Sequence, residues 1–157
     1  MPIPDFIVEL RELVGHRHLW LPGVTAVVRR DDQILLVQRA DNGAWTPVTG
    51  IPEPGEEPAA AAAREVLEET GVTARVDRLA SSWVSGPITH ANGDIATYLD
   101  VTFACTWVSG EPYVADDESR AVAWVRRDDL PAQGVGEEFL RRVDAAVSDE
   151  QAARFVR

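Results

Sequence analysis

One segment, residues 50–72, restricts the fold of this chain more than any other. Its sequence is GIPEPGEEPAAAAAREVLEETGV. The prolines and glycines in residues 50–57 exclude regular structure there, whereas Pro58 suits the first turn of a helix, where a missing N–H costs nothing. The alanines at 59–63 have the highest helix propensity of all residues. Gly71 is placed to end the helix, so the segment predicts a loop followed by a short helix.

The predicted helix carries three carboxylates close together. At about 100° per residue, Glu65, Glu68 and Glu69 fall within an arc of roughly 100°. Carboxylates so close repel each other, at a cost of about a few tenths of a kcal/mol per i,i+4 pair. Mg²⁺ binds carboxylate oxygens and substrate phosphates, so it would convert this repulsion into a binding site. The segment therefore predicts metal-assisted chemistry on a phosphate compound.

The same segment resembles the signature of the Nudix hydrolase family at every position that the signature specifies. The matching residues are Gly50, Glu56, Arg64, Glu65, Val66, Glu68, Glu69, Gly71 and Val72. Ile51 stands where many members carry a second glycine, at a position that the signature leaves free. The resemblance implies an α/β (α+β) fold, the Nudix α/β/α sandwich with a mixed β-sheet. It also implies a diphosphatase that uses Mg²⁺, with Mn²⁺ as a substitute, to hydrolyse a nucleoside diphosphate linked to another moiety.

The resemblance also assigns roles to single residues. The implied metal-binding residues are Gly50, Glu56, Glu65, Glu68 and Glu69, and the implied supporting residues are Arg64 and Gly71. Glu68 is the first choice for the base that takes a proton from the attacking water, with Glu65 beside it in the catalytic group. Some members place the base in a later loop, so Glu118 is the second candidate. An exposed acidic turn explains Glu118 equally well.

The choice of substrate depends on fewer residues. In the family, a proline about 15 residues beyond the motif is associated with ADP-ribose hydrolysis, and Pro87 lies at that distance from Val72. The favoured substrate is therefore ADP-ribose or a related nucleotide sugar. Arg39 and Arg29 are expected to meet its ribose or phosphates. Candidates for stacking on a base are Trp45, Trp20, Trp83, Tyr98 and Tyr113, although large aromatic residues more often belong to the core.

Two other functions stay open. The first is a house-cleaning pyrophosphohydrolase of oxidised or non-standard nucleoside triphosphates, which would use the same carboxylates. The second belongs to a different class, a non-catalytic regulatory domain that binds a nucleotide. Loss of a motif glutamate would favour the regulatory domain, but all four are present.

Length and charge limit the partners. The chain has 157 residues and a net charge of −11, which fits one domain and disfavours nonspecific binding to nucleic acid. We expect residues 1–22 to form an N-terminal helix and linker, 23–147 the core and 148–157 a tail. No apolar run approaches about 18 residues and no secretory signal is visible. A cytoplasmic protein that acts on a small nucleoside diphosphate derivative, without membrane or nucleic-acid partners, is expected.

Hydrophobic periodicity gives the remaining elements. The predicted helices are 4–14, 58–71 and 136–147, and the predicted strands are 24–29, 33–39, 45–48, 72–84, 95–108 and 121–125, with 85–94 as a loop. Residues 148–157 would extend the last helix or fray. In the motif helix, the side expected to pack on the sheet comprises Ala60, Ala63, Val66 and Leu67. The N-terminal helix and the basic-aromatic linker after it could pack across a homodimer, with Trp20 or Arg17 beside the neighbouring site.

Overall fold

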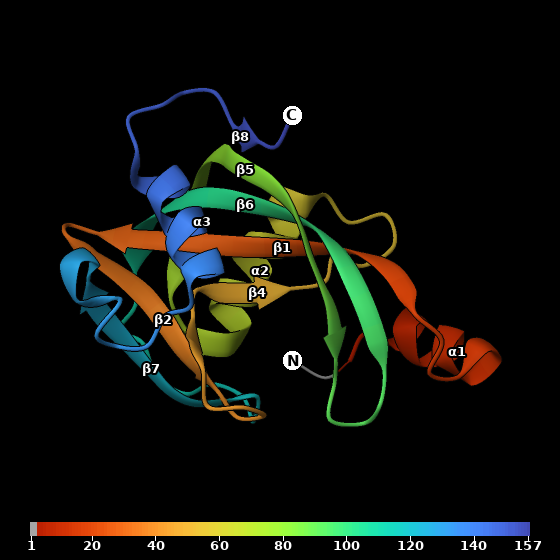
Figure 1. Ribbon diagram of the computed structural model, residues 1–157. Coiled ribbons are helices and arrows are strands. Elements are labelled where there is room, and N and C mark those ends of the chain that lie inside the picture. The colour runs from red at the N-terminus through yellow and green to blue at the C-terminus, as the bar shows by residue number, and fades with distance from the viewer. Residues whose placement is uncertain (1–2) are drawn as a thin grey trace.

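A computed structural model describes residues 3–157, and a single mixed sheet forms its centre (Figure 1). The strands are β1 (Leu19–Arg30), β2 (Gln33–Arg39), β3 (Trp45–Thr46), β4 (Val48–Gly50), β5 (Thr73–Thr89), β6 (Ile95–Ser109), β7 (Ser119–Arg126) and β8 (Arg154–Phe155). Their order is β3-β2-β1-β6-β5-β8, with β4 beside β1 and β7 beside β2. The long strands β1 and β6 run parallel in the middle, and β5 pairs with β6 antiparallel.

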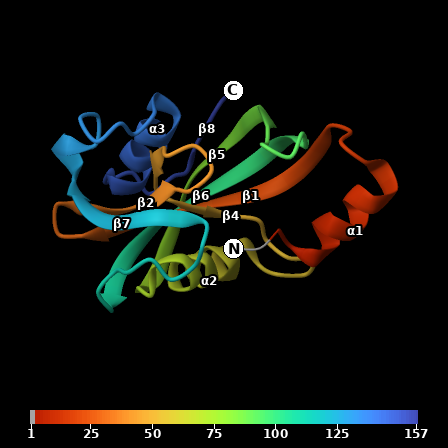
Figure 2. The same ribbon diagram turned by 90° about the horizontal axis from the view of Figure 1, so that it is seen from below.

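Helices cover both faces of this sheet (Figure 2). The helices are α1 (Asp5–Val14), α2 (Pro58–Thr70), α3 (Glu137–Val147) and a short 3-10 helix (Arg127–Asp129). Of these, α2 and α3 cover the two faces, and α1 lies beyond the N-terminal end of β1 (Figure 1 and Figure 2). One core lies between α2 and the sheet, and a second lies between α3 and the opposite face. None of the helices within residues 3–157 has the length and apolar character to cross a bilayer. The expected mixed sheet with helices on both sides is confirmed.

The motif helix begins and ends where the sequence predicts. Pro58 occupies its first turn, and Gly71 follows it in the left-handed conformation, with φ of 69°. The Gly71 N–H donates to the Leu67 carbonyl at 2.9 Å. A Cβ at Gly71 would meet the Tyr113 ring at 2.1 Å, so this position requires glycine both for its backbone conformation and for the close approach.

The side of α2 that packs on the sheet agrees with the prediction at Val66, which is fully buried, but differs from it at Ala60 and Leu67. The buried residues are Ala61, Ala62, Glu65, Val66, Glu69 and Thr70, whereas Leu67 is 53% exposed and Ala60 is exposed. Two of the three carboxylates therefore face inward. Alanine carries little hydrophobic signal, so the run at 59–63 does not fix the rotation of the helix. The glycine at position 50 of β4 leaves the space that an inward carboxylate needs.

Three further expectations are corrected by the strand pairing. β1 begins at Leu19, inside the expected linker, because it pairs with β6 from that residue onward. β5 continues to Thr89, with a cis Gly86–Pro87 bond inside it, and the register shift between Ser85 and Ile88 accommodates a residue without an N–H. The tail neither extends α3 nor frays throughout, since β8 pairs with β5.

Candidate functional site

Arg64 joins the motif loop to the motif helix. Its Nε and Nη2 donate to the two carboxylate oxygens of Glu56, each at 2.8 Å. Its Nη1 donates to Glu65 Oε1 at 3.0 Å and to Glu68 Oε2 at 3.1 Å. Glu56 also accepts the Glu53 N–H at 3.0 Å, and the hydrogen bond from Arg64 holds the pKa of Glu56 below its ordinary value. The loop is thus closed onto the helix by one guanidinium and one carboxylate, the position expected of a supporting arginine.

Glu65 lies completely buried between α2 and β4. A Cβ at Gly50 would lie 2.2 Å from the Glu65 carboxylate carbon, so only glycine leaves room for this side chain. The Oε2 atom of Glu65 has no hydrogen-bond partner among residues 3–157. Burial raises its pKa to about 7, against the opposing effect of Arg64. An oxygen that is buried without a partner is costly unless something binds it.

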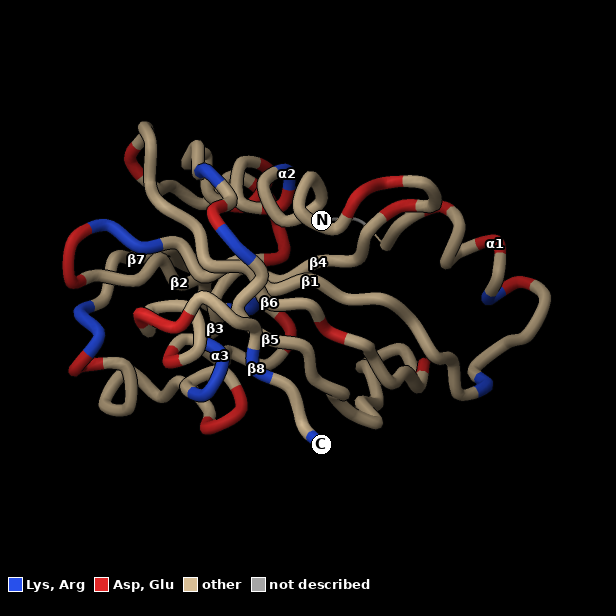
Figure 3. Tube along the Cα trace, turned by 90° about the horizontal axis from the view of Figure 1, so that it is seen from above, with Lys and Arg blue, Asp and Glu red and all other residues tan. Residues whose placement is uncertain are grey.

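Glu69 lies one helical turn further on and is 6% exposed. Burial raises its pKa to about 8, and the carboxylates of Glu65, Asp116 and Glu118 add to the rise. These acids come from two segments that lie far apart in the sequence. Figure 3 shows the acidic positions on α2 and on the loop that leads into it. Their mutual repulsion marks a place that attracts a cation.

Backbone hydrogen bonds bring the second acidic segment to the end of α2. In the stretch between β6 and β7, the Tyr113 N–H donates to the Thr70 carbonyl at 3.0 Å, and the Ala115 N–H donates to the Glu69 carbonyl at 3.3 Å. The next residues, 116–118, therefore turn toward Glu69. From the run of three acids at 116–118, the sequence analysis gave a role to Glu118 and none to Asp116.

Glu68 occupies a different position from its two neighbours. Its side chain is 46% exposed, and Arg64 approaches it from the side of the loop. The preferred base of the sequence analysis thus faces solvent at the rim, while Glu65 and Glu69 face inward.

The arrangement suits a divalent cation that prefers oxygen ligands. In residues 3–157 no group of three or more His, Cys, Asp or Glu side chains is arranged so that it could hold a metal ion as it stands, and the Arg64 guanidinium lies among three of the glutamates. The partnerless Oε2 of Glu65 and the neighbouring Glu69 nevertheless provide what Mg²⁺ prefers, namely carboxylate oxygens, one of which has no partner among the described residues. The residues present therefore fit the metal.

Of the predicted substrate contacts, the structure brings Arg39 to the carboxylates. Arg39 ends β2 and forms a two-pronged ion pair with Asp41, at 3.0 and 2.8 Å. That hydrogen bond raises its pKa, and Glu118 and Glu69 raise it further. Arg39 pairs with Ser119 of β7, and the next residue, Ala40, donates its N–H to the Glu118 carbonyl at 2.6 Å, so Arg39 lies beside the acidic segment 116–118.

The other three predicted contacts lie elsewhere. Arg29 is near the far end of β1, opposite Ile34 of β2, and lines a surface hollow with Arg126 and Arg127. Trp45 packs against the core under α3. Pro87 is exposed on β5. The structure does not place these residues beside Glu65 and Glu69.

Comparison with known proteins agrees with this geometry. The model of the NUDIX domain matches residues 19–146 of the chain. The chain belongs to the Nudix hydrolase family. A MutT-like protein of Streptomyces ambofaciens is 34% identical over 119 residues, which make up 76% of this chain and 71% of that protein. A NUDIX hydrolase structure from Nitrosomonas europaea superposes with a TM-score of 0.67 at 30% identity, covering 81% of this chain and 88% of that one.

A longer Nudix relative is the NAD-capped RNA hydrolase NudC of Escherichia coli. It is 36% identical over 112 residues, which make up 70% of this chain but only 40% of NudC. The chain therefore spans less than half of the length of this relative.

Proposed function

We propose that this Nudix hydrolase cleaves the diphosphate linkage of a nucleoside diphosphate joined to another moiety, with ADP-ribose or a related nucleotide sugar as the favoured substrate. The observation that carries the proposal is the pair of inward carboxylates, Glu65 and Glu69, one of which has a buried oxygen without a partner. Similarity to NudC, whose name specifies an NAD-capped RNA, supports a substrate in which a diphosphate joins two larger groups.

Each motif residue has a place in the proposed mechanism. Glu65 and Glu69 would hold the cation, with Glu56, Glu68 and the backbone at Gly50 close by. A bound Mg²⁺ would neutralise negative charge on the diphosphate and lower the pKa of the attacking water. Glu68 accepts the proton of that water, since it lies at the exposed rim where solvent arrives. Glu118 is the alternative base.

The remaining residues position the substrate. Arg39 donates to a phosphate next to the acidic cluster and balances part of its charge. Arg64 keeps the loop of residues 50–57 closed against α2, so that Glu56 and Glu68 stay on the same side as the substrate. Nucleophilic attack on phosphorus then yields AMP and ribose 5-phosphate from ADP-ribose.

A product screen tests this proposal. Wild type, Glu68→Gln and Glu118→Gln are incubated with Mg²⁺ and ADP-ribose, other nucleoside diphosphate sugars, or normal and oxidised dNTPs, and mass spectrometry identifies the products. Glu57→Gln is the matched control, because Glu57 is exposed and stands at a position that the signature leaves free. We expect Glu68→Gln to lose about 10³-fold in kcat. If Glu118→Gln lost activity while Glu68→Gln kept it, the base would be Glu118.

The same screen separates the alternatives. A nucleoside monophosphate and pyrophosphate formed from a dNTP would replace the proposal by house-cleaning hydrolysis. Binding of a nucleotide without turnover of any compound would replace it by a regulatory domain.

We also propose a homodimer formed through α1 and the start of β1. Leu13 and Trp20 are 85% and 60% exposed in this region. Light scattering of wild type and of Trp20→Ala tests the association, and a monomeric wild type would remove the proposal.

A further inference from the structure

The connection between β6 and β7, residues 110–118, runs past the C-terminal end of α2 (Figure 2). It is held at its start, where the Trp107 Nε1–H donates to the Gly110 carbonyl at 2.8 Å. It is held again at its end, where the Ala40 N–H donates to the Glu118 carbonyl at 2.6 Å. The 110–118 segment is therefore tied at one end to β6 and at the other to the residue that follows β2.

Between these ties, the 110–118 segment lies directly against the end of the helix. A Cβ at Gly110 would meet the Gly71 carbonyl oxygen at 2.8 Å, and a Cβ at Gly71 would meet the Tyr113 ring at 2.1 Å. Two glycines, one on each side of the contact, thus permit an approach that a side chain at either position would block. As a result, the Tyr113 ring covers the residue that ends α2.

The same segment supplies partners for backbone groups at the end of α2. The last carbonyls of an α-helix have no partner within the helix itself. Here the Tyr113 N–H donates to the Thr70 carbonyl at 3.0 Å, and the Ala115 N–H donates to the Glu69 carbonyl at 3.3 Å. These two carbonyls belong to the last two residues of α2. The last turn of the helix is therefore held from outside, by Tyr113 and its neighbours.

The two inward carboxylates differ in what fixes them. Glu65 lies in the middle of α2 and is enclosed by Gly50 of β4. Glu69 is the next-to-last residue of the helix, and helix ends fray unless their final carbonyls have partners. The position of Glu69 relative to Glu65 therefore depends on the 110–118 segment, whereas the position of Glu65 does not.

We propose that Tyr113 is a positioning residue for the metal site: its ring, packed on Gly71, fixes the last turn of α2 and so keeps Glu69 in place beside Glu65. This inference rests on the proposed function, because it assumes that these two glutamates hold the cation. Replacing a residue that orients a metal ligand without touching the metal typically costs about 10- to 100-fold in affinity or activity. The loss of the Tyr113 ring should therefore be visible in metal binding.

Metal binding and hydrogen exchange test the proposal together. Isothermal titration calorimetry with MnCl₂ alone gives Kd for wild type and Tyr113→Ala, at a temperature where circular dichroism shows both to be folded. We expect Tyr113→Ala to weaken Mn²⁺ binding about tenfold. In the metal-free proteins, mass spectrometry follows amide exchange in peptides that cover residues 61–66 and 67–72. Exchange should become about tenfold faster at 67–72 and stay unchanged at 61–66, because only the last turn loses its support.

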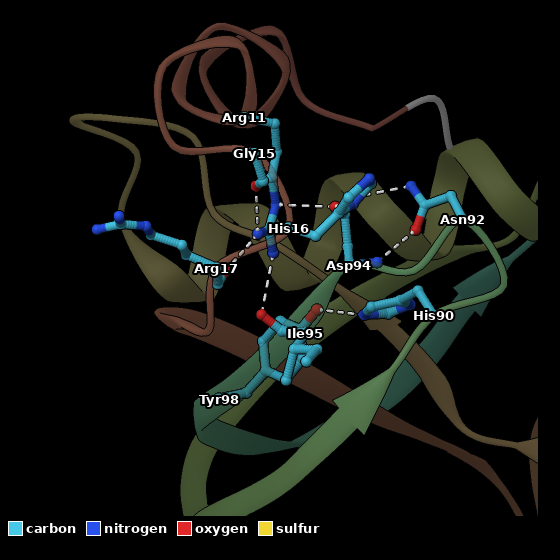
Figure 4. Close-up of polar contacts among 9 residues, drawn as sticks. All are labelled: Arg11, Gly15, His16, Arg17, His90, Asn92, Asp94, Ile95 and Tyr98. Atoms are coloured by element: carbon cyan, nitrogen blue, oxygen red, sulfur yellow. Dashed lines mark hydrogen bonds and ion pairs between the residues drawn. The ribbon is translucent and has the colours of Figure 1, made fainter.

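A structural contact elsewhere in the molecule provides a control for general loss of stability. Arg11 holds α1 against the turn between β5 and β6 (Figure 4). Its Nη2 donates to the Ile95 carbonyl at 3.0 Å, and its Nε lies 3.4 Å from Asp94 Oδ1. Both contacts lie outside α2 and the 110–118 segment, so Arg11→Gln should lower the free energy of unfolding but leave the Kd for Mn²⁺ unchanged.

Two aromatic variants control for the ring itself. Tyr113→Phe keeps the ring over Gly71 and should keep the Kd for Mn²⁺ within about twofold of wild type. Phe155→Ala removes a ring of nearly the same exposure, 60% against 61% for Tyr113, from β8. It should leave both the Kd and the exchange at 67–72 unchanged.

Three results would overturn this inference. Unchanged exchange at 67–72 in Tyr113→Ala would show that the ring does not hold the end of the helix. Faster exchange with an unchanged Kd would show that the ring supports the helix but not the metal site. An equal loss of Mn²⁺ affinity in Arg11→Gln would assign the effect to general stability.

The outcomes also distinguish this inference from the proposed function. A wild type that binds Mn²⁺ and loses affinity in Tyr113→Ala, but hydrolyses none of the nucleoside diphosphate derivatives, would defeat the proposed function alone. An active wild type whose Kd for Mn²⁺ is the same in Tyr113→Ala would defeat the inference alone. A wild type that neither binds Mn²⁺ nor hydrolyses any compound would defeat both.

In active protein, the dependence of the rate on metal gives a second test. Tyr113→Ala should raise the Mg²⁺ concentration for half-maximal rate about tenfold. At saturating Mg²⁺, kcat should return to within about threefold of wild type, because the carboxylates themselves are unchanged. A fall in kcat that saturating Mg²⁺ does not restore would contradict the assignment.

Discussion

Two groups of buried acids lie on opposite sides of the sheet, and they differ in how their charge is balanced. On the α3 side, Asp100 accepts hydrogen bonds from Thr25 and Thr102 at 2.8 and 3.0 Å and faces Arg142 at 3.4 Å. On the α2 side, Glu65 keeps an oxygen without a partner among residues 3–157, and Glu69 is surrounded by further acids. In the first group both carboxylate oxygens of Asp100 have partners within the chain. In the second group one carboxylate oxygen of Glu65 has none among residues 3–157.

This difference helps to distinguish buried acids that stabilise the fold from buried acids that belong to a functional site. Burial raises the pKa of Asp100 just as it raises those of Glu65 and Glu69, so a raised pKa alone does not identify a site. The distinguishing property is whether the polar atoms of the group are satisfied by the fold. A buried network that is satisfied stabilises one arrangement, whereas one that lacks partners costs free energy unless a ligand supplies them.

The largest effect should come from removing a charge on the unbalanced side. Glu65→Gln should lower kcat by about 10³-fold, because the carboxylate is needed for the cation. Its free energy of unfolding in a chelator should not fall, since one of two repelling buried acids becomes neutral. Kinetics measure kcat, and urea denaturation in EDTA measures the free energy of unfolding. A large loss of stability with normal activity would show that Glu65 has a structural role and not a functional one.

On the balanced side, the expected change is in stability. Arg142→Ala should lower the free energy of unfolding by about 3 kcal/mol, because Asp100 would remain buried without its cation. Urea denaturation measures the loss. The double variant Asp100→Asn/Arg142→Met should be more stable than Arg142→Ala, and equal stability of the two would show that the charge of Asp100 is not the cause.

A methyl group at position 50 should disturb the unbalanced side sterically. Gly50→Ala would place a Cβ 2.2 Å from the Glu65 carboxylate carbon, so we expect a loss of about 2 kcal/mol in stability together with weaker Mg²⁺ binding. Thermal melting and calorimetric titration measure these effects. Gly134→Ala is not a fair control because its φ is +88°, whereas Gly136→Ala meets no atom within 4 Å and should be nearly neutral.

A smaller effect should appear with pH. The folded-state pKa values of Glu65 and Glu69, about 7 and about 8, lie above the ordinary value of 4.5. Folded protein therefore binds more protons than unfolded protein between these values, and stability without metal should fall by about 1 kcal/mol or more as pH rises from 5 to 8. Denaturation in EDTA measures this slope. In Glu69→Gln the slope should be shallower, and an unchanged slope would assign it to other groups.

The features predicted best from the sequence are those that depend only on neighbouring residues in the chain. The loop, the first turn at Pro58 and the end at Gly71 follow from residue types that act within a few positions, and the structure confirms them. The predicted strands 24–29 and 33–39 are separated by only three residues, and they pair antiparallel as β1 and β2.

Properties that depend on distant segments were missed. The rotation of α2 depends on Gly50, which belongs to another element, and alanines give no strong preference for one face. Arg39 and Arg29 look alike in sequence, because both lie near the end of a predicted strand. In the structure, Arg39 at the end of β2 lies near the acidic cluster, whereas Arg29 near the end of β1 lines a hollow elsewhere on the surface. Asp116 reaches Glu69 only because backbone groups at 113 and 115 bind the end of α2. Arg11 lies in a helix whose partner, the turn at 90–94, is some 80 residues away.

The inward glutamates also determine how the protein exchanges ions with its surroundings. With pKa values of about 7 and 8, Glu65 and Glu69 retain much of their hydrogen near neutral pH when no cation is bound. A divalent cation that binds there, as proposed, would displace that hydrogen into solution. The site would then exchange protons for a metal cation, so that the two buried carboxylates would not both carry unbalanced negative charge.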